Sequence, residues 1–338
     1  MIRRVDMVHY LETNSLDPCF NLAFEEHVLE TRRTGGWLML WQDAPSVIIG
    51  LNQLAAAEVD GEFARARGIA VVRRATGGGA VYHDAGNMNY SIFGDAGDAA
   101  SLSLSRFMEP VCRALRALGV PAEATGRNDI TVNGLKVSGT AQRLSGGRIL
   151  HHGTLLFETD AATMSAVLRP DTGKFESKAA KSVRSRVGQI RDFLPDGATL
   201  ADFKAALLAE LTKDGLVRET LTDAELDEIR RLADEKYRSW DWTWARAPEF
   251  GFKNSRRFPG GTLTVSLDVS GGVIRRAHFC GDFMALIPCA PAQEALMGVR
   301  FEREAVISAL SGLDMRPMLG TITAEDVASV IFEPHLKI

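Results

Sequence analysis

RRATGGGAVYHDAGNMNYS, residues 73–91, alternates sharply between apolar, glycine and polar blocks. Short apolar runs rich in β-branched and aromatic residues lie on both sides of the glycines, so the stretch predicts strands joined by a glycine turn. Gly77, Gly78 and Gly79 carry no Cβ, which permits positive φ and lets a ligand lie against backbone N–H groups. Because Arg73 and a second arginine stand just upstream, the turn is a candidate anion site.

Two familiar phosphate-binding motifs do not fit this turn. A P-loop requires G-x-x-x-x-G-K-[ST], and no Lys-Ser or Lys-Thr follows Gly79 at that spacing. A dinucleotide fingerprint opens a helix, whereas strand-forming residues follow here. A glycine-rich hairpin that binds nothing stays as the alternative, weakened by the arginines and by the His83-Asp84 pair.

A second informative stretch is GRNDITVNGLKVSGTAQR, residues 126–143. Asn133-Gly134 lies between two alternating runs, which is a strong signal for a two-residue hairpin. Lys136 alternates with the apolar Leu135 and Val137, so we expect its side chain on the opposite face. From the residues alone, Lys136 is either a solvated edge lysine or a functional cation.

Composition bounds the class of protein. The 338 residues are long enough for two domains, and 46% hydrophobic with 24% charged residues is ordinary for a globular chain. The net charge of −4 gives no basic footprint for nucleic acid or an anionic membrane. Four scattered cysteines without metal-ligand spacing, and no apolar run or signal peptide, make the cytoplasm the expected compartment.

Helices and strands are expected in an α+β arrangement. The tryptophan-rich connector at 237–252 indicates a junction before a smaller α+β module. The adjacent His151 and His152 should point to opposite faces of a strand, so zinc is not expected there. The periodicity predicts helices at 21–32, 58–67, 104–118, 160–168, 200–211, 222–236, 301–310 and 324–331, with strands at 37–41, 47–50, 69–72, 149–158, 262–269 and 273–279.

The two quoted stretches resemble the paired signatures of the lipoate–protein ligase family, within the biotin/lipoate protein ligase superfamily. Segments near Asp17 and Val47 and the C-terminal module extend the resemblance over nearly the whole chain. It implies a class II synthetase-like catalytic domain over residues 1–245, with a mixed, largely antiparallel sheet and flanking helices. It also implies the accessory C-terminal domain of long-form ligases over residues 246–338.

The resemblance further implies an enzyme that uses ATP and Mg²⁺ to activate lipoate as lipoyl-AMP and then acylates a lysine. A carboxylate attacking ATP brings two anions together, and a fixed ammonium between them offsets the repulsion in the transition state. Lys136 is expected in that role, with Asn128 and Asp129 positioning the nucleotide or the magnesium ion. The expected site comprises Lys136, Arg73, Gly77, Gly78, Gly79, Ala80, Val81, Asn128, Asp129 and His152.

By the same resemblance, the acceptors are lipoyl carrier domains, namely those of the E2 subunits of 2-oxoacid dehydrogenases and the glycine cleavage H protein. We expect a monomer without nucleic-acid or membrane partners. The basic run at 174–191 is either a solvated charge run or a lid that closes over the intermediate.

Three alternatives stay open. An octanoyl or lipoyl transferase would work without ATP through a cysteine nucleophile, but none of the four cysteines falls near the Lys136 hairpin. A biotin ligase is disfavoured because that branch carries a Gly-Arg-Gly-Arg pattern. A non-catalytic binder would not need Lys136. The sequence does not rank lipoate against octanoate, since chains that differ by a few methylenes are discriminated weakly.

Overall fold

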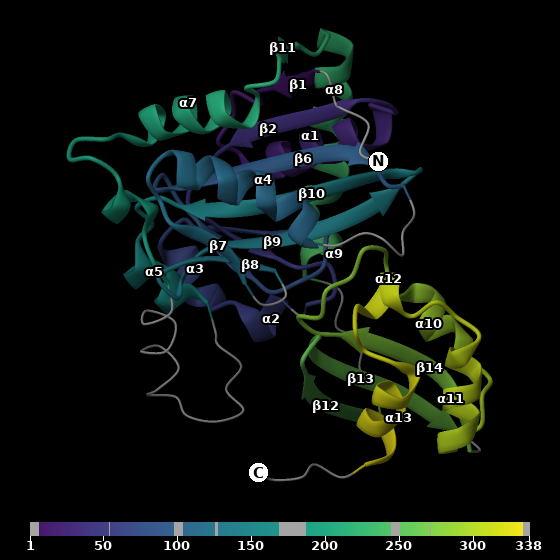
Figure 1. Cartoon of the computed structure of the whole chain (residues 1–338). Coiled ribbons are helices and arrows are strands. Elements are labelled where there is room, and N and C mark those ends of the chain that lie inside the picture. The colour runs from purple at the N-terminus through teal and green to yellow at the C-terminus, as the bar shows by residue number, and fades with distance from the viewer. Residues whose placement is uncertain are drawn as a thin grey trace.

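The computed structural model describes residues 7–53, 55–97, 104–125, 128–168, 187–244, 251–270 and 272–333. An eight-stranded sheet, a small three-stranded sheet beside it and a separate C-terminal unit make up the fold (Figure 1). Across the large sheet the strands run β11 (Leu216–Arg218), β1 (Val8–Leu11), β2 (Gly36–Trp41), β6 (Asn87–Asp95), β10 (Arg148–Leu156), β9 (Leu135–Ser145), β8 (Asp129–Val132) and β7 (Ala122–Thr125).

Strand β1 pairs in parallel with both β2 and β11, and every other neighbouring pair in this sheet is antiparallel. The predicted mixed, largely antiparallel sheet is therefore confirmed. At the β8–β9 hairpin both turn residues have positive φ, 51° for Asn133 and 79° for Gly134. Those angles match the turn that an Asn-Gly pair favours between twisted strands.

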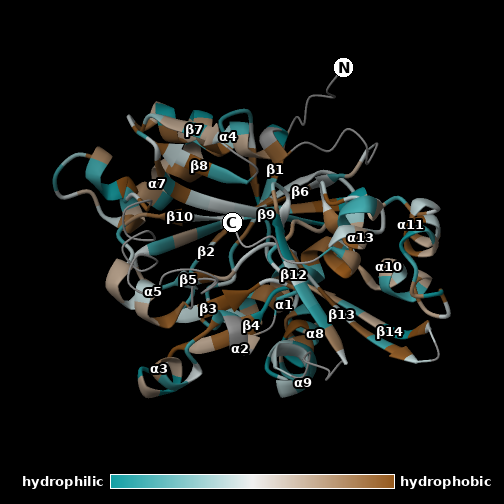
Figure 2. Ribbon diagram, turned by 90° about the horizontal axis from the view of Figure 1, so that it is seen from below, coloured by the Kyte–Doolittle hydropathy of each residue, from teal (hydrophilic) through white to brown (hydrophobic). Residues whose placement is uncertain are grey.

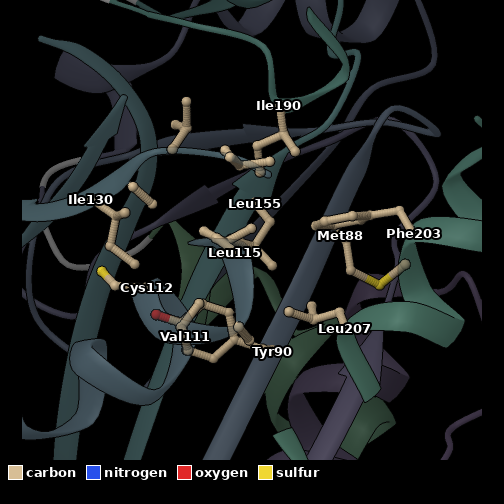
Figure 3. Packing of buried hydrophobic residues seen from close by; sticks show 14 of the residues in the cluster. Met88, Tyr90, Val111, Cys112, Leu115, Ile130, Leu155, Ile190, Phe203 and Leu207 are labelled. Atoms are coloured by element: carbon tan, nitrogen blue, oxygen red, sulfur yellow. The ribbon is translucent and has the colours of Figure 1, made fainter. Parts of the chain in front are cut away.

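Helices cover both faces of the large sheet. On one face α4 (Leu104–Ala117) and α7 (Leu200–Leu211) enclose an apolar core, in which Val111, Cys112 and Leu115 of α4 lie near Tyr90, Leu155 and Leu207 (Figure 3). The other face carries α1 (Pro18–Thr31), α8 (Asp223–Leu232), the π-helix η3 (Ala233–Tyr237) and α9 (Trp240–Thr243).

The start of α1 agrees with the sequence. The Asp17 side chain accepts a hydrogen bond from the Cys19 N–H at 3.0 Å, and Pro18 occupies the first turn, where its missing donor costs nothing.

The small sheet has the order β4 (Ala70–Arg73), β3 (Ser46–Ile49) and β5 (Val81–His83). Figure 2 shows it largely brown, because buried Val and Ile side chains fill it. Strands β4 and β5 both pair with β3 and not with each other, so the glycine turn crosses the end of β3 instead of closing a hairpin. The short helices beside it are α2 (Ala55–Glu58), α3 (Gly61–Ala66) and α5 (Ala161–Val167).

One predicted helix begins later than expected. The sequence pattern predicts a single helix at 58–67, whereas α2 ends at Glu58 and α3 begins at Gly61. The reason is local, since the Asp60 side chain accepts from the Phe63 N–H at 2.9 Å and caps a new helix.

The C-terminal unit has its own core. Its three-stranded sheet packs against its helices around buried Leu, Val and Phe side chains (Figure 1). Its strands are β12 (Phe252–Phe258), β13 (Gly261–Ser270) and β14 (Val273–Cys280), and its helices are α10 (Ala290–Ala295), α11 (Arg303–Ser311), α12 (Arg316–Leu319) and α13 (Ala324–Phe332).

A part-buried ion cluster ties α1 to η3 and β9. The Glu26 carboxylate accepts from Lys236 Nζ at 2.7 Å, from the Tyr237 hydroxyl at 2.6 Å and from Arg143 at 2.9 Å. Burial alone would raise the pKa of Glu26, but the two cations outweigh it and hold that pKa below its ordinary value.

We expect Glu26→Gln to lower the free energy of unfolding by about 3–5 kcal/mol at pH 7, because it removes the carboxylate that Lys236 and Arg143 share. Since the folded-state pKa is depressed, this stabilisation is present above the unfolded pKa and is lost as the pH falls through the folded value. Urea unfolding at pH 7 and in acid measures both effects. Asp227→Asn, on an exposed carboxylate, should change stability by less than about 1 kcal/mol.

Candidate functional site

A cavity of about 90 Å³ lies between the small sheet and the β9–β10 hairpin. It joins the end of the glycine turn to Lys136, two regions more than 50 residues apart in the chain. The lining residues are Leu22, Trp41, Ile48, Arg74, Gly79, Ala80, Val81, His83, Asn89, Asn128, Lys136, Gly139, Thr140, Ala141, His152, Gly153 and Thr154.

A larger open groove, about 930 Å³, lies between β1 and α8. Its lining mixes acidic and basic side chains and includes no residue of the two quoted motifs. Convergent chemistry therefore favours the smaller cavity as the candidate site.

Lys136 is held at the cavity by its own hairpin. Its Nζ lies 2.8 Å from Asp129 Oδ1, across the β8–β9 pair. A Cβ on Gly139 would stand 3.1 Å from that Nζ, so the lysine side chain lies over a residue that has no side chain. The register of the β8–β9 pair shifts by one residue next to Lys136, which marks a β-bulge. A fixed ammonium beside a cavity can stabilise negative charge there.

The two arginines of the turn behave differently. Arg73 is buried and donates to five backbone carbonyls, at distances of 2.7–2.9 Å, and it does not line the cavity. Arg74 lines the cavity and donates to the carbonyls of Gly77 at 2.6 Å and Gly79 at 2.8 Å. The sequence analysis expects Arg73 at the ligand, whereas in this structure the arginine that lines the cavity is Arg74. Burial lowers the pKa of Arg74 to about 10, which leaves it protonated at neutral pH.

The glycine turn contacts the C-terminal unit. The Gly78 N–H donates to the Phe283 carbonyl at 3.2 Å, and a Cβ on Gly77 would stand 2.6 Å from the Ala285 nitrogen. Gly78 has a φ of 90°, which only glycine adopts without strain. Gly77 and Gly78 therefore pack against the C-terminal unit, while Gly79, Ala80 and Val81 line the cavity.

His152 belongs to a hydrogen-bonded chain along the cavity wall. Its Nδ1 lies 2.9 Å from Glu25 Oε1, and its Nε2 lies 2.8 Å from Thr76 Oγ1. Thr76 in turn accepts from Arg74 Nε at 2.8 Å, so a buried carboxylate on α1 is linked to the glycine turn. His151 points to the other side of the strand, as predicted, where burial lowers its pKa to about 3.

Asn128 lines the cavity, whereas Asp129 does not line it but forms an ion pair with Lys136, which does. The Asn128 amide donates to the Thr140 carbonyl at 2.9 Å, which fixes the start of β8 against β9. Gly126 and Arg127, and residues 174–186 of the suggested lid, lie outside the described residues. Val187, at the end of that run, pairs with Lys136 in a parallel bridge.

Sequence reasoning missed several residues at the site. Arg74 lines the cavity, and the buried Thr76 and Glu25 hydrogen-bond to His152 behind the wall. The loop that carries Phe283 comes from the C-terminal module. Arg74 stood in the quoted motif, so the pair of arginines was the available signal. Nothing near Glu25 marked it, because a glutamate on a helix is usually solvated.

Over the described ranges, no group of three or more His, Cys, Asp or Glu side chains is arranged to hold a metal ion. No helix within the same ranges combines the length and the apolar character that a bilayer span requires.

Two family models match the chain. Residues 17–212 match the lipoyl protein ligase A/B catalytic domain, and residues 247–331 match the bacterial lipoate protein ligase C-terminus. The chain is 40% identical over 325 residues to the lipoate-protein ligase LplJ of Bacillus subtilis strain 168, covering 94% of this chain and 98% of that protein.

The fold is also similar to those of solved lipoate-protein ligase structures. A P. falciparum LipL1 in complex with lipoate superposes with a TM-score of 0.76 at 24% identity, over 91% of this chain and 94% of that one. The bipartite lipoate protein ligase of a Thermoplasma acidophilum system, described with its E2 lipoyl domain, gives a TM-score of 0.64 at 31% identity, over 73% and 98%. A lipoate-protein ligase A bound with ATP gives 0.60 at 29% identity, over 70% and 97%.

Proposed function

The chain belongs to the lipoate–protein ligase family, and from that premise we propose that this enzyme uses ATP to convert lipoate to lipoyl-AMP and then acylates a lysine of a lipoyl carrier domain. The observation that carries the proposal is the cavity that joins Lys136 to the end of the glycine turn. A site for two reacting anions needs fixed positive charge and backbone donors at one place.

Different residues at the cavity are proposed to stabilise the two anions, hold the glycine turn and bind the aliphatic chain. Lys136 lies between the carboxylate and the α-phosphate, where its ammonium offsets their repulsion as charge builds at phosphorus. Arg74 holds the shape of the turn through the Gly77 and Gly79 carbonyls and adds a second positive charge. The apolar side chains of Leu22, Trp41 and Ile48 at the cavity suit the aliphatic chain of the acid.

Asn128, Asp129 and His152 complete the proposed site. Asn128 is proposed to contact the nucleotide, and His152 to support the turn through Thr76. Mg²⁺ prefers oxygen ligands and is usually bound by one or two carboxylates plus substrate phosphates. Asp129 fits as that carboxylate, because it forms an ion pair with Lys136, which lines the cavity. A magnesium ion at this place would neutralise phosphate charge.

We propose residues 1–245 as the catalytic domain and 246–338 as the accessory domain. Each part encloses its own hydrophobic core. The catalytic-domain model matches residues before this boundary, and the C-terminal model matches residues after it. The proposed acceptors are lipoyl domains of E2 subunits and the glycine cleavage H protein. An E2 lipoyl domain described together with the T. acidophilum ligase supports that class.

The alternative is transfer of an octanoyl or lipoyl group without ATP, which needs a cysteine nucleophile. All four cysteines are buried, and none is among the described residues that line the cavity. Burial raises the thiol pKa to about 11 in Cys112 and Cys280 and to about 12 in Cys19, so these thiols stay protonated at neutral pH. The ligase is therefore favoured over the transferase.

Release of pyrophosphate tests the proposed function. The purified chain with Mg-ATP should release pyrophosphate only when lipoate is added, before any acceptor is present. Addition of an apo lipoyl domain should then give a mass increase of one lipoyl group. A preparation that modifies the domain from a lipoyl or octanoyl thioester, yet releases no pyrophosphate from ATP, would establish the transferase instead.

Gly50 is expected to set the position of the turn. A Cβ at Gly50 would overlap the Gly78 carbonyl oxygen, and it would stand 3.3 Å from Arg74 Nη2. Gly50→Ala should therefore displace the turn and lower the rate of lipoyl-AMP formation about 10²-fold, the cost typical of a 1 Å misplacement. Gly94→Ala is the matched control, because nothing lies within 4 Å of its added Cβ. Equal rates for both variants would refute this role.

A further inference from the structure

Two histidines line the cavity, and their ring nitrogens are not equally occupied. Both nitrogens of His152 have partners, Glu25 on Nδ1 and Thr76 on Nε2. His83 has partners on Nδ1 alone, where Asp43 Oδ2 lies at 2.8 Å and the Asn89 amide nitrogen at 3.4 Å, and its Nε2 has no hydrogen-bond partner among the described residues. A buried polar atom without a partner is uncommon, and at a cavity wall it points to a ligand or a proton-transfer role.

The partner on Nδ1 fixes the tautomer of His83. The closer partner, Asp43, is a carboxylate and can only accept, so Nδ1 carries a proton, and in the neutral ring Nε2 keeps its lone pair. Asp43 is itself buried and oriented, because its Oδ1 accepts from the Asn21 amide at 2.8 Å. This is the arrangement in which a carboxylate orients a histidine and stabilises the imidazolium that forms when the histidine takes a proton.

The second half of the proposed reaction requires a base, whereas the first half does not. Lipoate is already a carboxylate at neutral pH, so its attack on ATP releases no proton. The acceptor lysine has a pKa of about 10.4 and arrives as an ammonium, which cannot attack an acyl group. The enzyme must therefore remove a proton from the lysine before transfer.

We propose that His83 is the general base for the acceptor lysine and that Asp43 is its positioning residue; this rests on the proposed ligase function. His83 Nε2 takes one proton from the ammonium and leaves the free amine. The amine nitrogen then forms a bond to the acyl carbon, the bond from that carbon to the phosphate oxygen breaks, and AMP leaves with the electron pair. The nitrogen releases its second proton to water once the amide forms.

The other titratable side chains on the described cavity wall are less suited. Lys136 and Arg74 are cations at neutral pH, and their charge serves the phosphate and the turn. Both ring nitrogens of His152 already face protein partners, Thr76 and Glu25, so neither is open to the lysine. His83 can accept a proton on Nε2 and still keep its hydrogen bond to Asp43.

The experiment separates the two half-reactions in the full chain. His83→Gln and Asp43→Asn are assayed first for lipoyl-AMP formation without acceptor, by pyrophosphate release. Each is then loaded with lipoyl-AMP and mixed rapidly with either an apo lipoyl domain or hydroxylamine, an amine that is already neutral at the assay pH. His9→Gln is the matched control, since His9 stacks on Trp37 and does not line the cavity.

We expect His83→Gln to form lipoyl-AMP within about threefold of the wild-type rate. Transfer to the lipoyl domain should fall about 10²- to 10⁴-fold, while transfer to hydroxylamine stays within about threefold. Asp43→Asn should show the same pattern with a smaller loss.

Equal losses with lysine and hydroxylamine, or a parallel loss of lipoyl-AMP formation, would assign His83 a structural or binding role and overturn the proposal. Unchanged transfer to the lipoyl domain would overturn it too. If the wild-type chain itself releases no pyrophosphate, the ligase function fails instead, which is a separate result.

Discussion

Lys136→Ala is expected to lower the rate of lipoyl-AMP formation at least about 10²- to 10³-fold, the cost typical of losing one preorganised group at a developing negative charge. The structure supports a loss at the chemical step, because the Lys136 ammonium is held at the cavity by Asp129 and lies over Gly139. Single-turnover release of pyrophosphate at saturating ATP and lipoate measures that step without acceptor.

Lys136→Arg should not restore the rate. A guanidinium is planar and larger than an ammonium, and it cannot occupy the same position above Gly139 as a compact point charge. Lys213→Ala is the matched control, because Lys213 is an exposed lysine far from the cavity lining. A Lys136→Ala enzyme within tenfold of the wild-type rate would remove Lys136 from the mechanism.

Arg73→Met is expected to lower the free energy of unfolding by about 3–5 kcal/mol. The Arg73 guanidinium serves the carbonyls of Gly50, Leu51, Gln53, Trp242 and Thr243, and all of these would lose a charged donor. A buried acceptor left without its donor costs about 1–3 kcal/mol, and relaxation around the shorter side chain reduces the sum.

Arg73→Lys should be nearly as harmful, since a single ammonium has three donors and cannot reach carbonyls on both sides of the strand. Urea unfolding followed by tryptophan fluorescence measures the loss, because Trp242 lies on the segment that Arg73 holds. Arg230→Met, on an exposed helix face, is the control. A stable Arg73→Met chain with a weakened affinity for the adenylate would instead support the ligand role that the motif suggested.

Local signals in the sequence predicted most of the fold. Asn133-Gly134 fixed the β8–β9 hairpin, and Asp17-Pro18 marked the start of α1, because each acts through its nearest neighbours. Strand β12 and the pairing of β4 and β5 on β3 were not predicted. Both depend on contacts between segments far apart in the chain, which periodicity does not report.

The candidate site likewise has residues that the sequence reveals and residues that only the fold brings together. The sequence singled out Lys136 and the glycine turn by residue type and spacing, and the structure brings Lys136 and the end of that turn to one cavity. It named Arg73, whereas the arginine that lines the cavity is Arg74, because neighbouring residues of an extended chain point to opposite sides and the motif does not say which side meets the cavity. Glu25 and the Phe283 loop come from other segments, so their approach to the site appears only in three dimensions.

The pairing of β1 with β11 has a consequence for how the chain folds during synthesis. Strand β1 lies at Val8–Leu11, and the strand that completes its outer side lies at Leu216–Arg218. On the ribosome, the backbone N–H and C=O groups on the outer side of β1 therefore stay unpaired until some two hundred further residues have been synthesised. An unpaired edge recruits other chains, so nascent chains that stop short of residue 216 should depend on chaperones far more than the finished protein does.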